Sequence, residues 1–479
     1  MEQRKNAPAC LTRRELLKCG LYCSVASALV PGFCSSGCSN GPGAKGPPNV
    51  LMISIDTLRK DHCSAYGYER DTTPNLRVLA EEGARFDLAY APSSSTAPSH
   101  ATMFTSLYPI THQVLKQGHT LSERDYTLAE HLNANGFQTA AVVASFVLDE
   151  KFGFAQGFTF YDDDFRASTA TIHQRYWKGQ TDIIDQHAVE TTRKAIGWLN
   201  KQRSWERPFF LFVHYFDPHA PYAPPEPFSS RFAPPGRQPT ELENIIGRYD
   251  GEIALTDREI GKLFETLKEA GLDENTLVLV TSDHGEGLGQ HDHLGHSINI
   301  YEEAIRVPLL FRWPNRIAKG CVFSAPVEQV DLAPTILDLI GVKADGFSFQ
   351  GRSLAAVLRG DGDASLDADR PVYLYREYFE GRRMKLHSGE QVWLKGGKSG
   401  IRAGKWKYIE GKEENTRELF DLVADPQEQR NCITTFSQEA AELASQLKAW
   451  EQGHSRKKSL KEKISEEDLN RLKALGYVL

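Results

Sequence analysis

The stretch Asn49-Val50-Leu51-Met52-Ile53-Ser54-Ile55-Asp56-Thr57 decides the fold class of this chain. Val50 to Ile55 is an almost continuous apolar run, which is typical of a strand that is buried on both faces. Such strands belong to parallel sheets that are covered by helices on both sides. Asp56 then stands at the carboxyl end of the strand, where open α/β sheets bind their ligands.

The same alternation of helices and buried strands continues along the chain. We expect helices over residues 76–83, 129–136, 181–201 and 253–270, and strands over residues 139–144, 209–213 and 277–280. This order indicates an α/β fold with a mostly parallel sheet flanked by helices. Beyond Val342, short strands over 373–375 and 405–409 and a charged helical end predict a smaller α+β C-terminal domain.

We divide the chain into four parts: a signal segment (1–40), a linker rich in glycine and proline (41–48), a catalytic domain (49–345), and a small C-terminal domain with a charged helical tail (346–479). Thr12-Arg13-Arg14-Glu15-Leu16-Leu17-Lys18 and the apolar stretch after it resemble a twin-arginine export signal. Ser35-Ser36-Gly37-Cys38 offers an alternative, a lipoprotein site with Cys38 acylated. We therefore expect the twin-arginine export machinery as a partner. The chain is expected to be exported in a bacterium, and to be periplasmic or attached to a membrane outside the cytoplasm.

Charge and cysteine usage exclude several classes of function. The formal net charge of -7 gives no electrostatic basis for binding nucleic acid, because polyanion binders need a basic face. Five of the eight cysteines fall in the first 40 residues, and Cys63, Cys321 and Cys432 are far apart. The body of the chain therefore has neither a disulfide framework nor a thiolate metal site.

Acidic residues follow three of the expected strands. Asp56, Asp217 and Asp283 each stand just beyond a strand, at the edge of the sheet where the strand ends meet. Loop aspartates often cap helices, but three acids at equivalent positions favour a ligand site. Asp56, Asp283 and His284 form an oxygen-rich set that suits one divalent ion, with the hydroxyl of Thr96 completing it.

Thr96 belongs to the segment Ser95-Thr96-Ala97-Pro98-Ser99-His100-Ala101-Thr102-Met103-Phe104-Thr105-Ser106, and we expect residues 97–106 to begin a helix. Coordination of its hydroxyl to a metal ion makes threonine an effective nucleophile. The backbone N–H groups at the start of the helix are suited to an anionic ester oxygen. Asp217, His219 and His296 are candidates for a second ion or for direct contacts to the transferred group.

These segments together resemble the sulfatase family, within the alkaline phosphatase superfamily. The resemblance is carried by residues 49–57, 95–106, 281–286 (Thr-Ser-Asp-His-Gly-Glu), 301–309, 330–335 and 419–426, which follow one another in the family's order. It implies the fold predicted above, a hydrolase of sulfuric or phosphoric esters, and at least one divalent ion that can be Ca, Mg, Mn or Zn.

The chain departs from the family's pattern at the positions that carry the chemistry. Sulfatases have Cys or Ser where this chain has Thr96, and Arg where it has His100. Threonine cannot give the formylglycine aldehyde, so no formylglycine is expected. Thr57 replaces the second acid of the first strand, His296 replaces a lysine, and the family's Gly-Lys-Trp-His segment is missing near residues 141–147. Related branches of the superfamily use threonine as the nucleophile on phosphoesters.

Three functions remain open. We predict a hydrolase that cleaves phosphate or sulfate esters of small molecules, glycans or lipids through Thr96, with His100, His219 and His296 as further catalytic residues. The alternatives are an inactive binding protein that keeps the fold, and a transferase that moves a phospho-substituent onto a cell-envelope acceptor.

Overall fold

The structure is a computed structural model, which describes residues 47–165, 184–234, 236, 238–361, 365–456 and 464–475. The signal segment, the export motif, Cys38 and nearly all of the linker lie outside these residues. Among the described residues, no helix combines the length and the apolar character that crossing a bilayer requires.

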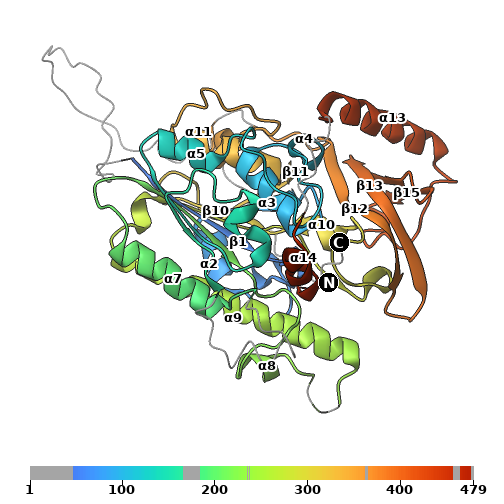
Figure 1. Ribbon diagram of the computed structural model, residues 1–479, viewed down its shortest axis with the longest axis horizontal. Helices are drawn as coiled ribbons and strands as arrows, with labels where there is room; N and C mark the ends of the chain where they lie inside the picture. The colour runs from blue at the N-terminus through green and yellow to red at the C-terminus, as the bar shows by residue number, and fades with distance from the viewer. Residues whose placement is uncertain are drawn as a thin grey trace, which may run out of the picture.

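A nine-stranded sheet forms the centre of the main domain (Figure 1). Its order is β11 (Cys321–Glu328), β2 (Ala84–Tyr90), β10 (Leu309–Arg312), β6 (Thr276–Ser282), β1 (Asn49–Ile55), β5 (Phe209–Tyr215), β3 (Gln138–Val142) and β4 (Phe160–Asp162), with β9 (Arg306–Val307) paired to β2. The run from β6 to β4 is parallel, and β10 is antiparallel to both of its neighbours. The prediction of a mostly parallel sheet is confirmed.

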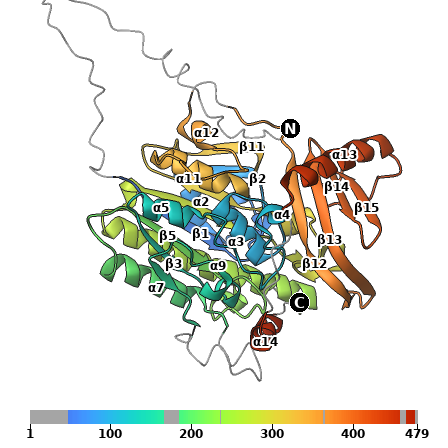
Figure 2. The same cartoon turned by 45° about the horizontal axis from the view of Figure 1, so that its top comes forward.

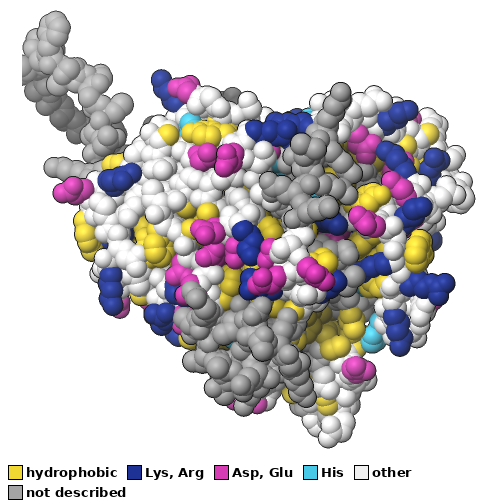
Figure 3. All heavy atoms as spheres, in the orientation of Figure 1, with side chains coloured by type: hydrophobic (Ala, Val, Ile, Leu, Met, Phe, Trp, Pro, Cys, Tyr) yellow, Lys and Arg dark blue, Asp and Glu magenta, His cyan; other side chains and the backbone are white. Residues whose placement is uncertain are grey.

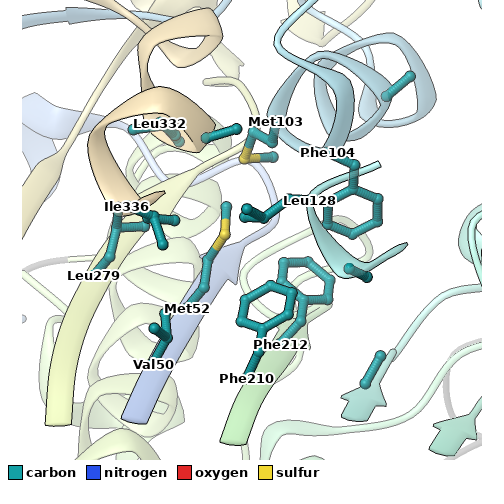
Figure 4. Packing of buried hydrophobic residues seen from close by; sticks show 14 of the residues in the cluster. Val50, Met52, Met103, Phe104, Leu128, Phe210, Phe212, Leu279, Leu332 and Ile336 are labelled. Atoms are coloured by element: carbon teal, nitrogen blue, oxygen red, sulfur yellow. The ribbon is translucent and has the colours of Figure 1, made fainter. Parts of the chain in front are cut away.

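Helices cover both faces of this sheet (Figure 2). One face packs against α3 (Thr96–Thr105), α5 (Leu128–Ala134) and α11 (Leu332–Ile340); the other packs against α2 (Pro74–Glu82), α7 (Ala188–Lys201) and α9 (Glu241–Glu269). In β1, Val50 and Met52 point into the first layer, whereas Leu51 and Ile53 point into the second. Figure 4 shows Met52 in the first layer, near Met103 and Leu128. Two-sided burial explains why this strand is apolar throughout.

The C-terminal region forms a second, antiparallel sheet of four strands in the order β12 (Val372–Lys385), β13 (Gln391–Ala403), β14 (Trp406–Gly411) and β15 (Thr416–Asp421). The two short strands expected here are parts of β12 and β14, both of which are longer. Helix α13 (Ser437–His454) packs on this sheet through Leu443 and Leu447. Helix α14 (Glu466–Ala474) instead returns to the main domain, where Leu472 joins the core of the first layer.

Short elements complete the described chain: α4 (Pro109–His112), α8 (Phe228–Arg231), α10 (Glu302–Ile305), α12 (Ala355–Arg359), β7 (Gly287–Leu288) and β8 (Leu294–Gly295). Cys63, Cys321 and Cys432 are buried and form no disulfide among the described residues. On the face drawn in Figure 3, acidic and basic side chains lie side by side.

Candidate active site

The carboxyl ends of β1 and β6, which are neighbours in the sheet, bring two of the predicted acids together. Asp56 and Asp283 follow these strands directly, and both are completely buried. One carboxylate oxygen of Asp283, Oδ1, accepts hydrogen bonds from the backbone N–H groups of Thr57 (3.2 Å) and His284 (2.8 Å). Thr57 adopts a left-handed backbone conformation (φ 56°). These bonds fix the orientation of the Asp283 carboxylate.

The remaining carboxylate oxygens of these two residues form no hydrogen bond among the described residues. Neither oxygen of Asp56 has a partner within the described chain, nor has Oδ2 of Asp283. Burial, together with the charges of Asp283 and Glu286, raises the pKa of Asp56 well above its ordinary value. Buried carboxylates persist where a cation compensates them. Asp56, Asp283 and His284 place ligand atoms within 4.8 Å of one another, so they fit a divalent ion.

His284 is in the correct tautomer for this role. Its Nδ1 lies 2.8 Å from the carbonyl oxygen of Gly285 and therefore carries the proton, which leaves Nε2 as an acceptor. Nε2 lies 3.5 Å from Oδ2 of Asp283 and 3.2 Å from the hydroxyl of Thr96. Thr96 is the first residue of α3, which begins one residue before the expected helix, and it is fully buried. The structure thus brings together all four residues predicted for the first ion.

His100 lies beneath this group, on the next turn of α3. Its Nδ1 donates to the carbonyl oxygen of Thr96 (2.9 Å), and its Nε2 is buried without a partner in the described chain. Burial lowers the pKa of His100, so the imidazole is neutral. It does not supply the positive charge of the arginine that the family pattern has at this position.

His214 is a site residue that the sequence reasoning missed. It belongs to β5, and its Nε2 lies 3.4 Å from Oδ2 of Asp56. Its Nδ1 accepts the backbone N–H of Ala144 (3.4 Å), so Nε2 carries the proton, and that nitrogen forms no hydrogen bond among the described residues. With His100 and Asp283 it also forms a compact group of ligand types. His214 thus lies beside Asp56, a position typical of the groups around a metal ion's direct ligands.

His219 and His296 lie together on the other side of His284. The ring centroids are 4.9 Å apart between His219 and His296, and 4.6 Å apart between His284 and His296. Nδ1 of His219 donates to the carbonyl oxygen of Ala220 (2.6 Å), and Nδ1 of His296 donates to Glu286 (3.0 Å). In both rings Nδ1 therefore carries a proton. Burial and the neighbouring imidazoles lower the pKa of His219 to about 3, and that of His296 well below its usual value.

Asp217 is not part of this arrangement. Its Oδ2 accepts the backbone N–H of Ala188 (2.6 Å) at the start of α7, and its Oδ1 lies 3.2 Å from Nδ1 of His187. Although burial opposes it, the Asp217 carboxylate raises the pKa of His187 to about 9. The prediction that Asp217 helps to hold a second ion is not supported by this geometry, because its carboxylate is turned toward α7.

The C-terminal sheet reaches the nucleophile segment. The backbone N–H of Tyr375 in β12 donates to the carbonyl oxygen of Pro92 (2.7 Å). The carboxylate of Glu377 lies 3.1 Å from Oγ of Ser95, which also lies 2.9 Å from Oγ of Ser297. Burial raises the pKa of Glu377 to about 7, against the opposing effect of the Ser95 hydrogen bond. The second domain therefore forms one wall of the site.

Comparisons with known proteins agree with this geometry. The family described as Sulfatase matches residues 48–342, and the family described as N-sulphoglucosamine sulphohydrolase, C-terminal, matches residues 289–455. The chain is similar to the N-acetylglucosamine-6-O-sulfatase of Bacteroides thetaiotaomicron, with 26% identity over 80% of this chain and 82% of that protein. It is also similar to an ulvan-active sulfatase of Formosa agariphila, with 27% identity over 81% of this chain and 77% of that protein.

Solved structures share the fold. A phosphonate monoester hydrolase of Agrobacterium radiobacter superposes with a TM-score of 0.69 at 23% identity, covering 85% of this chain and 96% of that one. A protein solved with its substrate D-glucosamine-2-N,6-O-disulfate superposes with a TM-score of 0.68 at 23% identity, covering 85% of this chain and 98% of that one.

Proposed function

The chain belongs to the sulfatase family and is an ester hydrolase, and from this premise we propose that it is a metal-dependent enzyme with Thr96 as its nucleophile. The observation that carries the proposal is the buried group of Asp56, Asp283 and His284, whose ligand atoms converge beside the Thr96 hydroxyl. A divalent ion held there lowers the pKa of a coordinated hydroxyl and neutralises charge on the transferred group.

We propose a reaction in two transfers. Oγ of Thr96 forms a bond to the phosphorus or sulfur atom as the bond to the ester oxygen breaks. The hydroxyl proton is released to solvent, and the leaving alkoxide takes a proton from water. A water molecule then displaces Thr96, which regains its hydroxyl while the free oxyanion leaves. His219 and His296, whose rings lie beside His284, are suited to orient this water.

We propose phosphoesters, including diesters, over sulfate esters as the preferred substrates. Thr96 cannot be converted to formylglycine, so the enzyme depends on attack by the alkoxide itself. Both substrate classes occur among proteins of similar structure: one is a phosphonate monoester hydrolase, and another was solved with a disulfated glucosamine. The test is turnover of aryl phosphate, bis-aryl phosphate and aryl sulfate with added Ca²⁺, Mg²⁺, Mn²⁺ or Zn²⁺. Turnover of the sulfate alone would reverse the preference. A product ester formed with added alcohol would indicate a transferase.

We further propose that each chain binds a single divalent ion at its active site. Asp217 is the one acidic residue in the predicted second ligand set, and its carboxylate accepts a hydrogen bond from the backbone of α7 instead. His219 and His296 then contact the transferred group or the attacking water. Metal analysis of active enzyme should give one equivalent per chain, and Asp217→Ala should leave that value unchanged. Two equivalents that fall to one in His219→Ala would establish the two-ion alternative.

Export remains a proposal from the sequence. The Arg13-Arg14 motif and the apolar stretch after it support export through the twin-arginine route. The test is the cellular location of the chain with Arg13 and Arg14 both replaced by lysine, which should remain in the cytoplasm. Labelling with a radioactive fatty acid that disappears in Cys38→Ser would establish the lipoprotein alternative.

A further inference from the structure

Gln117 occupies the N-terminal end of the helix that carries the nucleophile. Its side-chain Oε1 accepts the backbone N–H of Ala97 (2.9 Å), the residue that follows Thr96. Ser95, at the usual capping position, makes no side-chain hydrogen bond to the helix. Gln117 therefore takes the place of the cap, and its carboxamide lies beside the first turn of α3. There the N–H groups and the helix dipole favour negative charge.

The other end of this carboxamide is unsatisfied. Gln117 is completely buried, yet its Nε2 has no hydrogen-bond partner among the residues that the structure describes. A carboxamide nitrogen carries two N–H donors, and a buried donor without an acceptor is unfavourable. Capping of the helix does not explain why Nε2 is buried without a partner, because capping uses only Oε1.

A second glutamine shows the ordinary form of the same contact. Oε1 of Gln350 accepts the backbone N–H of Tyr108 (2.7 Å), and its Nε2 donates to the hydroxyl of Thr111 (3.0 Å). Both ends of that carboxamide are satisfied by the protein. In Gln117 the donor end has no such acceptor among the residues that the structure describes.

The position of Gln117 is fixed by the packing of the next residue. Gly118 has a left-handed backbone (φ 77°), and a Cβ atom there would lie 2.7 Å from Ile464 and 2.8 Å from Leu472. The left-handed backbone and these contacts favour glycine between this loop and the C-terminal helix α14. The loop therefore packs closely on α14, and the hydrogen bond to Ala97 holds the Gln117 carboxamide at the start of α3, as stabilisation of developing charge requires.

Building on the function proposed above, we propose that Nε2 of Gln117 donates a hydrogen bond to a non-bridging oxygen of the transferred phosphoryl or sulfuryl group. The donor supports the anionic oxygens while Oγ of Thr96 attacks. The first turn of α3 was expected to bind this oxygen through its backbone. The N–H of Ala97 is already used by Gln117, so the side chain takes over part of that task. Gln117 is neutral, so it supplies the contact without changing the charge of the site.

The variant Gln117→Glu separates this role from capping. It keeps an acceptor for Ala97 and adds a negative charge that the helix N-terminus favours, but it has no N–H donor. A residue that only caps would tolerate the change. A residue that binds the oxyanion would not. Gln117→Met, which removes both functions without adding charge, provides a second variant if the acidic one fails to fold. Gln350→Glu is the matched control.

The measurements are kcat/KM on the aryl ester that the wild-type enzyme cleaves, the inhibition constant of orthovanadate, and the thermal midpoint. We expect Gln117→Glu and Gln117→Met to lose about 100-fold to 1,000-fold in kcat/KM and to bind vanadate correspondingly weakly, as when one oxyanion donor is removed. Gln350→Glu should keep both values. A Gln117→Glu enzyme that stays within about threefold of wild type in both would overturn the inference. A wild-type enzyme with neither turnover nor vanadate binding would instead overturn the proposed function.

Discussion

Removing the metal ion should lower the stability of the protein by an amount that the site allows us to estimate. Both carboxylate oxygens of Asp56 and Oδ2 of Asp283 are buried without a hydrogen bond among the described residues, so an ion bound to the folded chain stabilises it relative to the unfolded chain. At an ion concentration 100 times the dissociation constant, this linkage contributes about 2.7 kcal/mol. The family-matched span 48–342 is about 300 residues, and its unfolding entropy is about 0.6 kcal/mol/K. The expected fall in the thermal midpoint is therefore about 4 °C.

The assay is thermal unfolding followed by circular dichroism, in a chelator and in a series of ion concentrations. Asp56→Asn is the matched variant, because it removes one ligand charge and keeps the shape of the side chain. We expect its midpoint to be independent of added ion. In the chelator it should be at least as stable as wild type, because the substitution removes a buried charge without a partner.

Two results would refute this reasoning. Equal midpoints for the wild-type protein in chelator and in saturating ion would mean that the buried carboxylates hold no ion. An Asp56→Asn midpoint that rises with ion as steeply as that of wild type would place the ion elsewhere. The second result would direct attention to His100 and His214, which form the other compact group of ligand types.

Three further predictions test other parts of the structure. Thr96→Ala should lower kcat by at least about 1,000-fold while Thr96→Ser keeps measurable turnover, in steady-state assays; equal losses in both would argue against a hydroxyl nucleophile. The raised pKa of Glu377, about 7, means that the folded chain holds a proton that the unfolded chain releases above its ordinary pKa near 4.5. Stability should therefore fall as pH rises through this window, and Glu377→Gln should remove up to about 3 kcal/mol of that fall in urea titrations at pH 5 and pH 8. Lys407 is fully buried, 2.8 Å from Glu428, so Lys407→Ala should cost about 3–5 kcal/mol of unfolding free energy, and adding Glu428→Gln should restore part of it.

Strand order predicts the positions of the acidic residues of the site, but it does not predict the directions of their side chains. Buried apolar runs indicated parallel strands, and parallel strands end at one edge, so the sequence located Asp56, Asp283 and His284 correctly at that edge. The same rule located Asp217 at the end of β5. It could not show the direction of the carboxylate, which depends on where α7 begins in space.

Two residues of the site gave weaker signals. His214 lies one residue beyond the expected strand 209–213, and the structure extends that strand to Tyr215. A histidine next to a strand buried on both faces has to find polar partners, and that was the available clue. Gln117 lies in a loop beyond α3, and no spacing connects it to Thr96. Its contact with Ala97 arises from tertiary folding alone, so only the structure could reveal it.

Helix α14 follows the C-terminal sheet in the sequence but packs on the main domain, so the two domains are tied together by a segment that belongs to both. The chain leaves the large sheet, builds the small one, and comes back to press Leu472 against the loop beside Gln117. An ion pair between Lys151 and Asp468 (2.7 Å) is a further contact between the main domain and α14. A fragment that ended at residue 342 would contain every proposed ligand of the ion. It would lack α14, and the loop that carries Gln117 and Gly118 would lose its packing partner. The smallest unit expected to work as an enzyme therefore extends to α14, well past the boundary that the catalytic motifs mark.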